Sequence, residues 1–211
     1  KRDLVKYFLN NSVSKLPIKR SDITTNVFGK SKGPHKEIYK AAKESLSQVY
    51  GIKVLEIPGS KNFICVSTAP TNSYIECPEN QRSELALLFI ILSYIFMEGG
   101  TVKEDVLFRF LKKFGIEADK CHDYFGDVKK LVLEVFPKQL YLSRVKDISI
   151  DSEETFDISW GYRSNVEFPK RCILEEVARL LDKKPEDFVG QHEEALEESE
   201  DDDNEGISVE G

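Results

Sequence analysis

The apolar positions of this 211-residue chain are densest over residues 85–97, where only Ser93 and Tyr94 carry polar side-chain atoms. Glu84 and Glu98 bracket this run. A helix of that length reaches about 20 Å, which is short of the roughly 30 Å hydrocarbon core of a bilayer. A helix that is apolar all round but too short to cross a membrane is typical of a globular core. We therefore predict a buried helix here and expect no membrane partner.

Ahead of this run, the pattern predicts three helices followed by a β-hairpin. A short amphipathic helix covers residues 4–9, and a second begins near Ser21 or Asp22 and ends at Gly29. The third is predicted by apolar residues at helical spacing: Ile38, Ala41, Ala42, Leu46 and Val49. Residues 53–68 then form two β runs around a Pro-Gly-Ser turn.

The same order repeats from the apolar run onwards. Gly99 and Gly100 end that helix, and Thr101 with Glu104 forms a T-x-x-E capping box that predicts the start of the next one. A third helix is predicted over residues 127–136 from its inward-facing apolar positions. Two β runs close the repeat, at residues 139–145 and 156–161.

Three helices followed by a β-hairpin is the order of a winged-helix domain, a helix-turn-helix variant with a β wing. Because the order occurs twice, we predict a mainly α fold with small β-hairpins (α+β class), built as tandem winged-helix domains. The last residues carry too few apolar groups to form a core. The predicted divisions are winged-helix domain A at 1–80, winged-helix domain B at 81–165, a C-terminal helical extension at 166–196 and an acidic disordered tail at 197–211.

The charge is distributed unevenly along the chain. The formal net charge is −7, but residues 186–211 carry 12 acidic residues and no lysine or arginine. Residues 1–185 therefore hold 25 acidic and 30 basic residues, a net charge of +5. A mildly basic body is compatible with a polyanionic partner in spite of the acidic total.

The sequence offers no recognisable catalytic or metal site. The four cysteines are far apart and form no C-x-x-C pair, and the neighbours Cys121 and His122 have no second ligand pair at zinc-finger spacing. We interpret the cysteines as reduced structural thiols of an intracellular protein. No G-x-S-x-G, P-loop, H-E-x-x-H or G-x-G-x-x-G motif is present. We expect no enzymatic activity, no cofactor, no metal and no small-molecule substrate.

Several segments, in order along the chain, resemble the MAGE (melanoma-associated antigen) homology domain family, a tandem winged-helix module. They are PIKRSDI, KAAKESLSQVYGIKVLEI, LLFIILSYIFMEGGTVKE, FGDVKKLV and FDISWGYRSN. The resemblance covers roughly residues 4–182. After it, KKPEDFVGQHEEAL resembles the MAGE-like non-SMC element subunit of the SUMO-ligase-containing structural-maintenance-of-chromosomes (SMC) complex, which acts in DNA repair.

The resemblance implies a non-catalytic adaptor subunit located in the nucleus on chromatin, with some of the protein in the cytoplasm. Its implied partners are a RING-type ubiquitin ligase subunit, which it would bind and stimulate, the kleisin subunit of an SMC complex, and double-stranded DNA. Two alternatives stay open. One is a MAGE-type regulator of a RING ligase that recruits substrate proteins outside the SMC complex. The other is a sequence-specific transcription factor, although no helix here is rich in the Arg and Asn that read bases.

The resemblance also places a partner surface on the first helix, where the family has a leucine pair in its RING interface. The matching positions are Phe8 and Leu9, so phenylalanine replaces the first leucine. The candidate RING contacts are Leu4, Val5, Phe8 and Leu9. The alternative is that these side chains pack onto their own domain, which would leave Leu9 or Tyr7 partly outside the buried stripe.

Basic residues of the second domain are candidates for binding DNA phosphates. Lys129 and Lys130 are predicted on the outer face of its third helix, where helix-turn-helix proteins contact DNA. Further candidates that could extend this surface are Arg144, Arg163, Lys170 and Arg171. The alternatives are ordinary solvated lysines, or a rival patch in the first domain formed by Lys36, Lys40 and Lys43 near Lys30 and Lys32. The acidic tail is a candidate for screening either patch.

Overall fold

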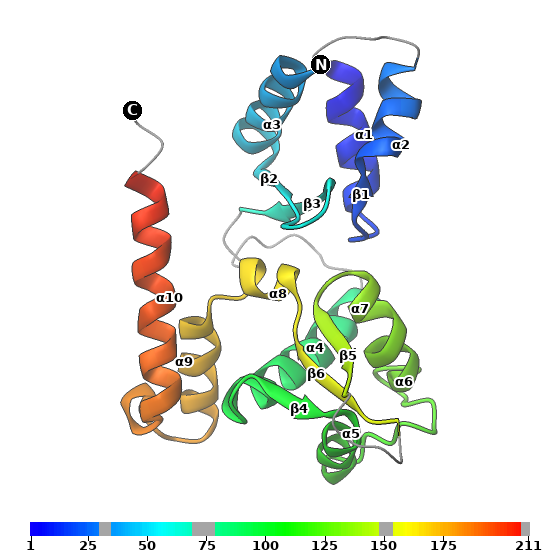
Figure 1. Cartoon of the computed structure of the whole chain (residues 1–211). Helices are drawn as coiled ribbons and strands as arrows, with labels where there is room; N and C mark the ends of the chain where they lie inside the picture. Colours follow the sequence, from blue (N-terminus) through cyan, green and yellow to red (C-terminus); the bar gives the residue numbers. More distant parts are fainter. Residues whose placement is uncertain (30–34, 69–78, 148–153, 208–211) are drawn as a thin grey trace. The chain divides into compact units, whose positions relative to one another are not determined.

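The computed structural model describes residues 1–29, 35–68, 79–147 and 154–207, with side chains described from residue 81 in the third range and up to residue 198 in the fourth. The chain forms two compact units, which we describe separately (Figure 1). The first unit comprises Lys1–Glu76 with Lys138–Leu140, and the second comprises Cys77–Pro137 with Tyr141–Gly211. The predicted domain boundaries at residues 80, 165 and 196 stay predictions.

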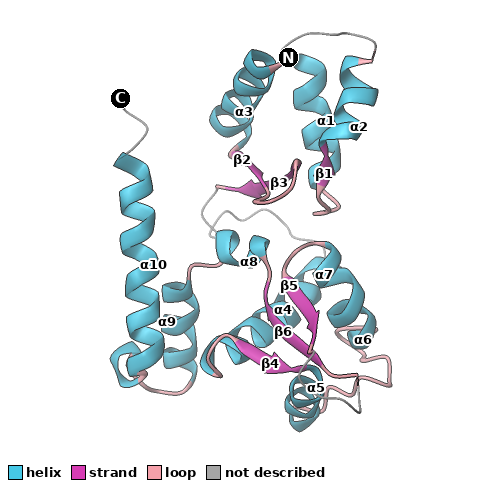
Figure 2. Cartoon of the chain, viewed as in Figure 1, coloured by secondary structure: helices cyan, strands magenta, loops and turns pink. Residues whose placement is uncertain are grey.

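The first unit contains helices and a small antiparallel sheet (Figure 2). Its elements are α1 (Arg2–Ser12), β1 (Ile18–Lys19), α2 (Arg20–Ile23), the π-helical turn η1 (Thr24–Phe28), α3 (Lys36–Tyr50), β2 (Ile52–Glu56) and β3 (Asn62–Ser67). The strand order is β1-β3-β2, with Ile18 opposite Phe63 and Val54 opposite Cys65. The sheet therefore contains the predicted hairpin and one further short strand, β1.

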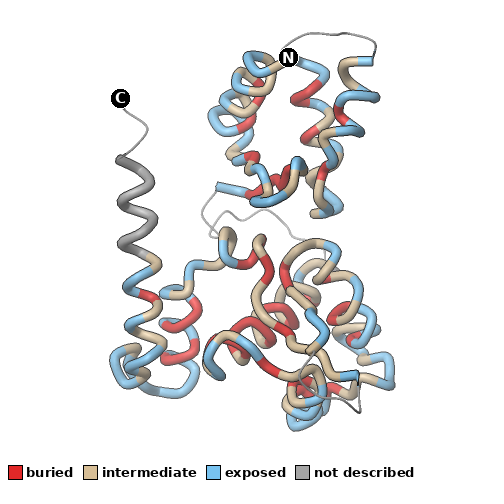
Figure 3. The backbone as a smooth tube through the Cα atoms, viewed as in Figure 1, coloured by how far each residue is buried: buried red, intermediate tan, exposed pale blue. Residues whose placement is uncertain are grey.

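The core of the first unit lies between α1, α3 and the sheet. Buried positions, red in Figure 3, recur along α1 and α3. The ring of Phe8 meets the ring of Phe63 edge to face at 5.8 Å. The apolar side chains on one face of α1 are thus packed in the core of the first unit. The buried cluster is Leu4, Val5, Phe8, Ile18, Ile23, Ala42, Leu46, Val54, Phe63 and Cys65.

The second unit repeats the arrangement with a longer first helix. Its elements are α4 (Glu79–Met97), β4 (Thr101–Lys103), α5 (Glu104–Lys113), α6 (Val128–Lys130), the π-helical turn η2 (Leu131–Val135), α7 (Phe136–Lys138), β5 (Leu142–Lys146), β6 (Phe156–Trp160) and α8 (Tyr162–Glu167). Its strand order is β4-β6-β5. The predicted capping box is wrong: Thr101 begins strand β4, which pairs with β6, and Lys103 precedes α5 without a side-chain cap.

Helix α4 is the buried centre of the second unit, which confirms the prediction from the apolar run. Leu87, Ile91, Leu92 and Ile95 have no exposed surface, and they pack with residues of α5, η2 and the sheet. The indole N–H of Trp160 on β6 donates a hydrogen bond to the backbone oxygen of Leu92 at 3.0 Å. No helix among the described residues is both long and apolar enough to cross a bilayer.

A helical hairpin completes the second unit: α9 (Lys170–Leu180), the short 3-10 helix η3 (Pro185–Asp187) and α10 (Val189–Ile207). A separate buried cluster joins Ile173, Leu174 and Val177 of α9 to Phe96 of α4 and Ala195 of α10. Residues 197–207, where we predict a disordered tail, continue α10 as helix. Glutamate is a good helix former, and α10 is already fixed on α9 before its acidic end. Residues 208–211 lie outside the described residues.

Candidate partner and DNA interfaces

The predicted RING contacts on α1 divide into buried and accessible positions. Leu4 and Phe8 have 0% of their surface exposed and Val5 is also buried, whereas Leu9 is only partly buried. The 3.6-residue period places positions 4, 5 and 8 on one stripe, and α3 and β3 cover that stripe. This is a correction to the sequence-based surface: Leu4, Val5 and Phe8 belong to the core of their own unit, so only Leu9 remains accessible.

Leu9 has an apolar neighbour that the sequence analysis missed. Val13 follows Leu9 by four residues and still has right-handed helical dihedral angles, so the two side chains lie on one face. Val13 is 73% exposed, and Leu16, shortly after it, is also exposed. We call Leu9, Val13 and Leu16 the α1 surface. The i, i+4 spacing of Leu9 and Val13 is a signal that the sequence already contained.

Lys129 and Lys130 lie at the start of α6, as predicted, and both are exposed. The helix begins at Asp127, whose side chain accepts a hydrogen bond from the backbone N–H of Lys130 at 2.9 Å. The ammonium group of Lys129 is 3.7 Å from Asp119, and both side chains are largely exposed, so this ion pair is weak. Lys130 has no ion pair among the described residues. Both lysines are therefore available to a polyanion.

Two further lysines, which were not among the predicted DNA contacts, lie at the end of the preceding helix α5. Lys112 and Lys113 end α5, are exposed and have no ion pair among the described residues. The pKa of Glu117 is lowered chiefly by its hydrogen bond with Lys120, and the charge of Lys112 adds to this. Lys112 is therefore close to the loop that also carries Asp119, the neighbour of Lys129. We call Lys112, Lys113, Lys129 and Lys130 the α5–α6 lysines.

Arg144 on β5 already has two partners in its own unit. Its Nε donates a hydrogen bond to Glu104 at 2.6 Å, and its guanidinium lies 3.4 Å from the ring centroid of Phe156. Little more than a quarter of the side chain is exposed. A charge that is already paired and stacked would lose these contacts on turning towards a phosphate. In this structure Arg144 therefore contacts Glu104 of α5 and Phe156 of β6, and a phosphate contact at Arg144 stays a prediction.

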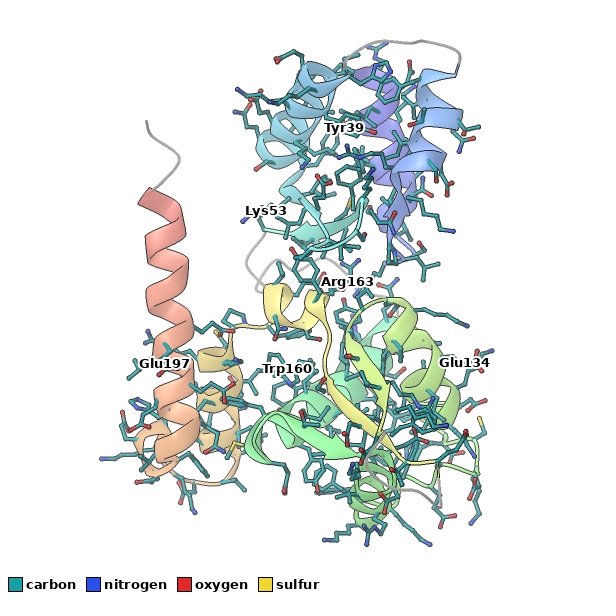
Figure 4. The ribbon with its side chains drawn as sticks, viewed as in Figure 1. Tyr39, Lys53, Glu134, Trp160, Arg163 and Glu197 are labelled. Carbon is teal, nitrogen blue, oxygen red and sulfur yellow. The ribbon has the colours of Figure 1, made fainter. Side chains whose placement is uncertain are left out.

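Arg163 on α8, labelled in Figure 4, is 1% exposed and cannot contact DNA. Its Nη1 is 2.7 Å from Oε1 of Glu167, and the Tyr141 hydroxyl donates a hydrogen bond to Oε2 of the same carboxylate at 2.6 Å. Burial, and then the Glu167 carboxylate, raise the pKa of Tyr141 far above its usual range. The DNA prediction for Arg163 is thus corrected: the residue is the cation of a buried charge network.

Lys170 and Arg171 lie at the start of α9, apart from the α5–α6 lysines in the second unit (Figure 1). The ammonium group of Lys170 is 2.7 Å from Glu194 and 4.0 Å from Glu198, both on α10. Arg171 is largely exposed and pairs with Glu175 on its own helix at 2.9 Å. The six predicted DNA contacts therefore do not form one continuous surface.

An open groove of about 680 Å³ lies in the second unit, with Lys130 among the residues that line it. Its apolar part comes from Phe125, Leu131 and Val135, and Tyr124 is an exposed aromatic residue at its edge. Polar side chains line the rest: Ser83, Glu84, Asp123, Asp127 and Lys130. The mixed lining suits an extended or helical peptide better than a nucleic-acid backbone.

The remaining candidates from the sequence are the possible metal ligand His122 and the rival basic patch of the first unit. His122 accepts hydrogen bonds from the backbone N–H groups of Tyr124 and Phe125 through its Nδ1, so it holds the loop before α6. The described residues contain no cluster of His, Cys, Asp or Glu that could hold a metal ion. In the rival basic patch, burial lowers the pKa of Lys43, whose ammonium lies 5.3 Å from the ring centroid of Phe63. Lys30 and Lys32 lie outside the described residues.

Each unit combines helices and a small antiparallel sheet in the winged-helix order, so the chain is a tandem winged-helix protein. A family model described as the MAGE homology domain matches residues 4–171, and the chain belongs to this family.

Similar proteins cover nearly the whole chain. The human non-structural maintenance of chromosomes element 3 homolog is 36% identical over 201 residues, which are 94% of this chain and 66% of that protein. Human melanoma-associated antigen D2 is 36% identical over 92% of this chain and 32% of its own length. The chain thus spans less than two thirds of either relative. A solved chain titled "Nse1-Nse3-Nse4 complex" matches with a TM-score of 0.86 and 36% identity, covering 92% of this chain and 94% of that chain.

Proposed function

We propose that this protein is a non-catalytic adaptor subunit of an SMC-type chromosome maintenance and DNA repair complex. It binds and stimulates a RING-type ubiquitin ligase subunit, contacts the kleisin subunit and binds double-stranded DNA in the nucleus. The observation that carries the proposal is the match to a chain from a structure titled as a three-subunit complex, at 36% identity over 92% of this chain. Because this similarity extends through both winged-helix units, it supports a shared set of partner surfaces and not only a shared fold.

The α1 surface is the proposed binding site of the RING partner. Leu9 is partly accessible and Val13 and Leu16 are exposed, and accessible apolar side chains of this kind can serve as anchors in a protein interface. Apolar anchors of this kind bind by filling a desolvated pocket on the partner. The buried stripe of Leu4, Val5 and Phe8 supports the interface from behind by fixing the position of α1.

The groove of the second unit is the proposed binding site of the kleisin. Its apolar part can hold one or two apolar side chains of a peptide, and the carboxylates that line it can fix the direction of that peptide. Tyr124 supplies an exposed aromatic ring at the edge, a residue type enriched at binding sites.

The α5–α6 lysines are the proposed DNA contacts. In a helix-turn-helix fold the third helix and the turn before it meet the duplex, and Lys129 and Lys130 are at that position. Lysines that grip phosphates need no base-reading partner, so the expected binding is independent of sequence and weakens steeply with salt.

Charge reversal of the Lys129 and Lys130 pair tests the DNA contact. We expect Lys129→Glu with Lys130→Glu to weaken binding to a short DNA duplex by at least about tenfold at 50 mM salt, because each lost phosphate contact removes one released counterion. The slope of log affinity against log salt should fall in magnitude by about 2. Fluorescence anisotropy over a salt series measures both quantities.

Lys36→Glu with Lys40→Glu is the matched control. These two lysines on α3 are exposed and have no ion pair among the described residues. Their substitution changes the net charge of the protein by the same amount as the Lys129 and Lys130 reversal. They also belong to the rival patch of the first unit. Equal loss in both double variants would show only a net-charge effect, and loss confined to the α3 pair would move the DNA contact to the first unit.

A MAGE-type regulator that recruits substrate proteins to a RING ligase outside the SMC complex is the second candidate function. The observation that favours it is the 36% identity to human melanoma-associated antigen D2, which equals the identity to the human element 3 homolog. The same α1 surface would serve in either case. The two candidates differ in whether kleisin and SMC subunits accompany the ligase.

A further inference from the structure

The acidic helix α10 makes specific contacts with the start of α9. Glu194 and Glu198 are four residues apart and therefore lie on one face of α10. Both carboxylates approach the ammonium group of Lys170, at 2.7 Å and 4.0 Å. The backbone N–H of Lys170 also donates a hydrogen bond to Oε2 of Glu198 at 2.7 Å. One basic residue at the beginning of α9 is thus held by two carboxylates from another helix.

The neighbouring acidic residues of α10 behave differently. Glu193 and Glu197 each precede one of the two contacting residues, are exposed, and have no ion pair among the described residues (Glu197 is labelled in Figure 4). Helix α10 therefore carries two pairs of glutamates with the same spacing and charge. Only one pair touches Lys170, so a general effect of negative charge can be separated from the effect of direct contact.

The contacts at Lys170 match those that a DNA phosphate would make. An ammonium group and a backbone N–H that has no acceptor within its own helix, both at the start of an 11-residue helix, are donors to an oxyanion. We propose that α10 acts as an intramolecular competitor of DNA: Glu194 and Glu198 cover a second phosphate contact at Lys170, and a duplex must displace them to reach it. This inference rests on the proposed DNA-binding function.

The competitor is placed so that it can be displaced without unfolding the unit. Ala195 of α10 is buried against α9, and the side-chain amide of Gln191 donates a hydrogen bond to the backbone oxygen of Met97 at 3.0 Å. These contacts keep the helix on the unit and are independent of the ion pairs. The charged groups themselves are partly exposed, and ion pairs of this kind are weak and screened by salt.

The test compares two double variants of the full chain with a short DNA duplex as the probe. In the first, Glu194→Gln with Glu198→Gln removes both carboxylates from Lys170. In the second, Glu193→Gln with Glu197→Gln makes the same change in charge without touching Lys170. We expect the first variant to bind up to about tenfold more tightly at 50 mM salt and to show a salt slope steeper by about 1, because one phosphate contact is added. The second variant should show a fold-change in DNA affinity less than half as large as that of the first variant.

A triple variant that adds Lys170→Gln to the first pair should lose the gain. Equal gains in the two double variants, no gain in the first, or a gain that survives Lys170→Gln would each overturn the inference. Glu198 also accepts a hydrogen bond from the backbone N–H of Lys170, so its substitution could unfold the first turn of α9. Thermal unfolding of every variant separates such a loss of structure from the outcomes above. Charge reversal of Lys129 and Lys130 tests the proposed function independently. If that reversal leaves DNA binding unchanged while the first double variant still gains affinity through Lys170, only the location of the primary DNA contact is wrong.

Discussion

Replacing Phe8 by alanine will destabilise the first unit by about 3–5 kcal/mol, the cost of removing a fully buried aromatic side chain. Phe8 has no exposed surface and its ring packs edge to face on Phe63, so the cavity would open at the contact between α1 and the sheet. A loss of this size is a large part of the roughly 5–15 kcal/mol that stabilises a typical domain. Urea unfolding of the full chain, followed by circular dichroism, measures it.

Leu9→Asp is the matched substitution on the accessible side of the same helix. It should leave the unfolding midpoint of the first unit nearly unchanged, because Leu9 lies at the edge of the core. It should, however, abolish co-purification of a RING-type partner by placing a charge in an apolar interface. If Phe8→Ala is tolerated while RING binding is lost, the side chain faces the partner and the description of α1 is wrong.

Replacing Arg163 by alanine will destabilise the second unit by about 3–5 kcal/mol, because it leaves the partly buried Glu167 carboxylate without its cation. The Tyr141 hydroxyl, which donates to the same carboxylate, cannot compensate a full charge. Thermal and urea unfolding measure the loss. The affinity for DNA, measured on the folded protein at low temperature, should stay at the parental value.

Arg109→Ala is the control for this prediction. Arg109 also pairs with a carboxylate four residues away, Asp105 at 2.9 Å, but both side chains are about 70% exposed. Its removal should change stability by less than about 0.5 kcal/mol. Loss of DNA binding by Arg163→Ala without loss of stability would contradict the buried network and restore Arg163 to a nucleic-acid surface.

Much of the fold can be predicted from the sequence because it rests on strong periodic signals. The run over residues 85–97 predicts α4 and its burial, and the repeated order of helices and β runs predicts two winged-helix units. The short strands β1 and β4 escape prediction because two or three residues carry no periodicity. The T-x-x-E pattern at Thr101 misleads because pairing of β4 with β6 overrides a local helix signal.

The interfaces are harder to predict because exposure depends on contacts distant in the sequence. The apolar stripe of α1 is visible, but nothing local shows that α3 and β3 cover Leu4 and Phe8. Arg163 lies four residues before Glu167, a spacing typical of a surface ion pair, and only the fold buries that pair with Tyr141. Lys170 meets Glu194 and Glu198 because η3 turns the chain back on itself. Lys129 and Lys130 are exposed as predicted because the apolar residues on either side of them, Val128 and Leu131, take the positions that face the core.

We propose that this protein is an adaptor shared by a RING ligase and an SMC complex. The most direct test is purification of the tagged full chain from a native extract, followed by mass spectrometric identification of the proteins retained in stoichiometric amounts. We predict a RING-type subunit, a kleisin and SMC subunits together, with the RING subunit alone lost from the Leu9→Asp variant. Recovery of a RING ligase without kleisin or SMC subunits, or of none of the three, would contradict the claim.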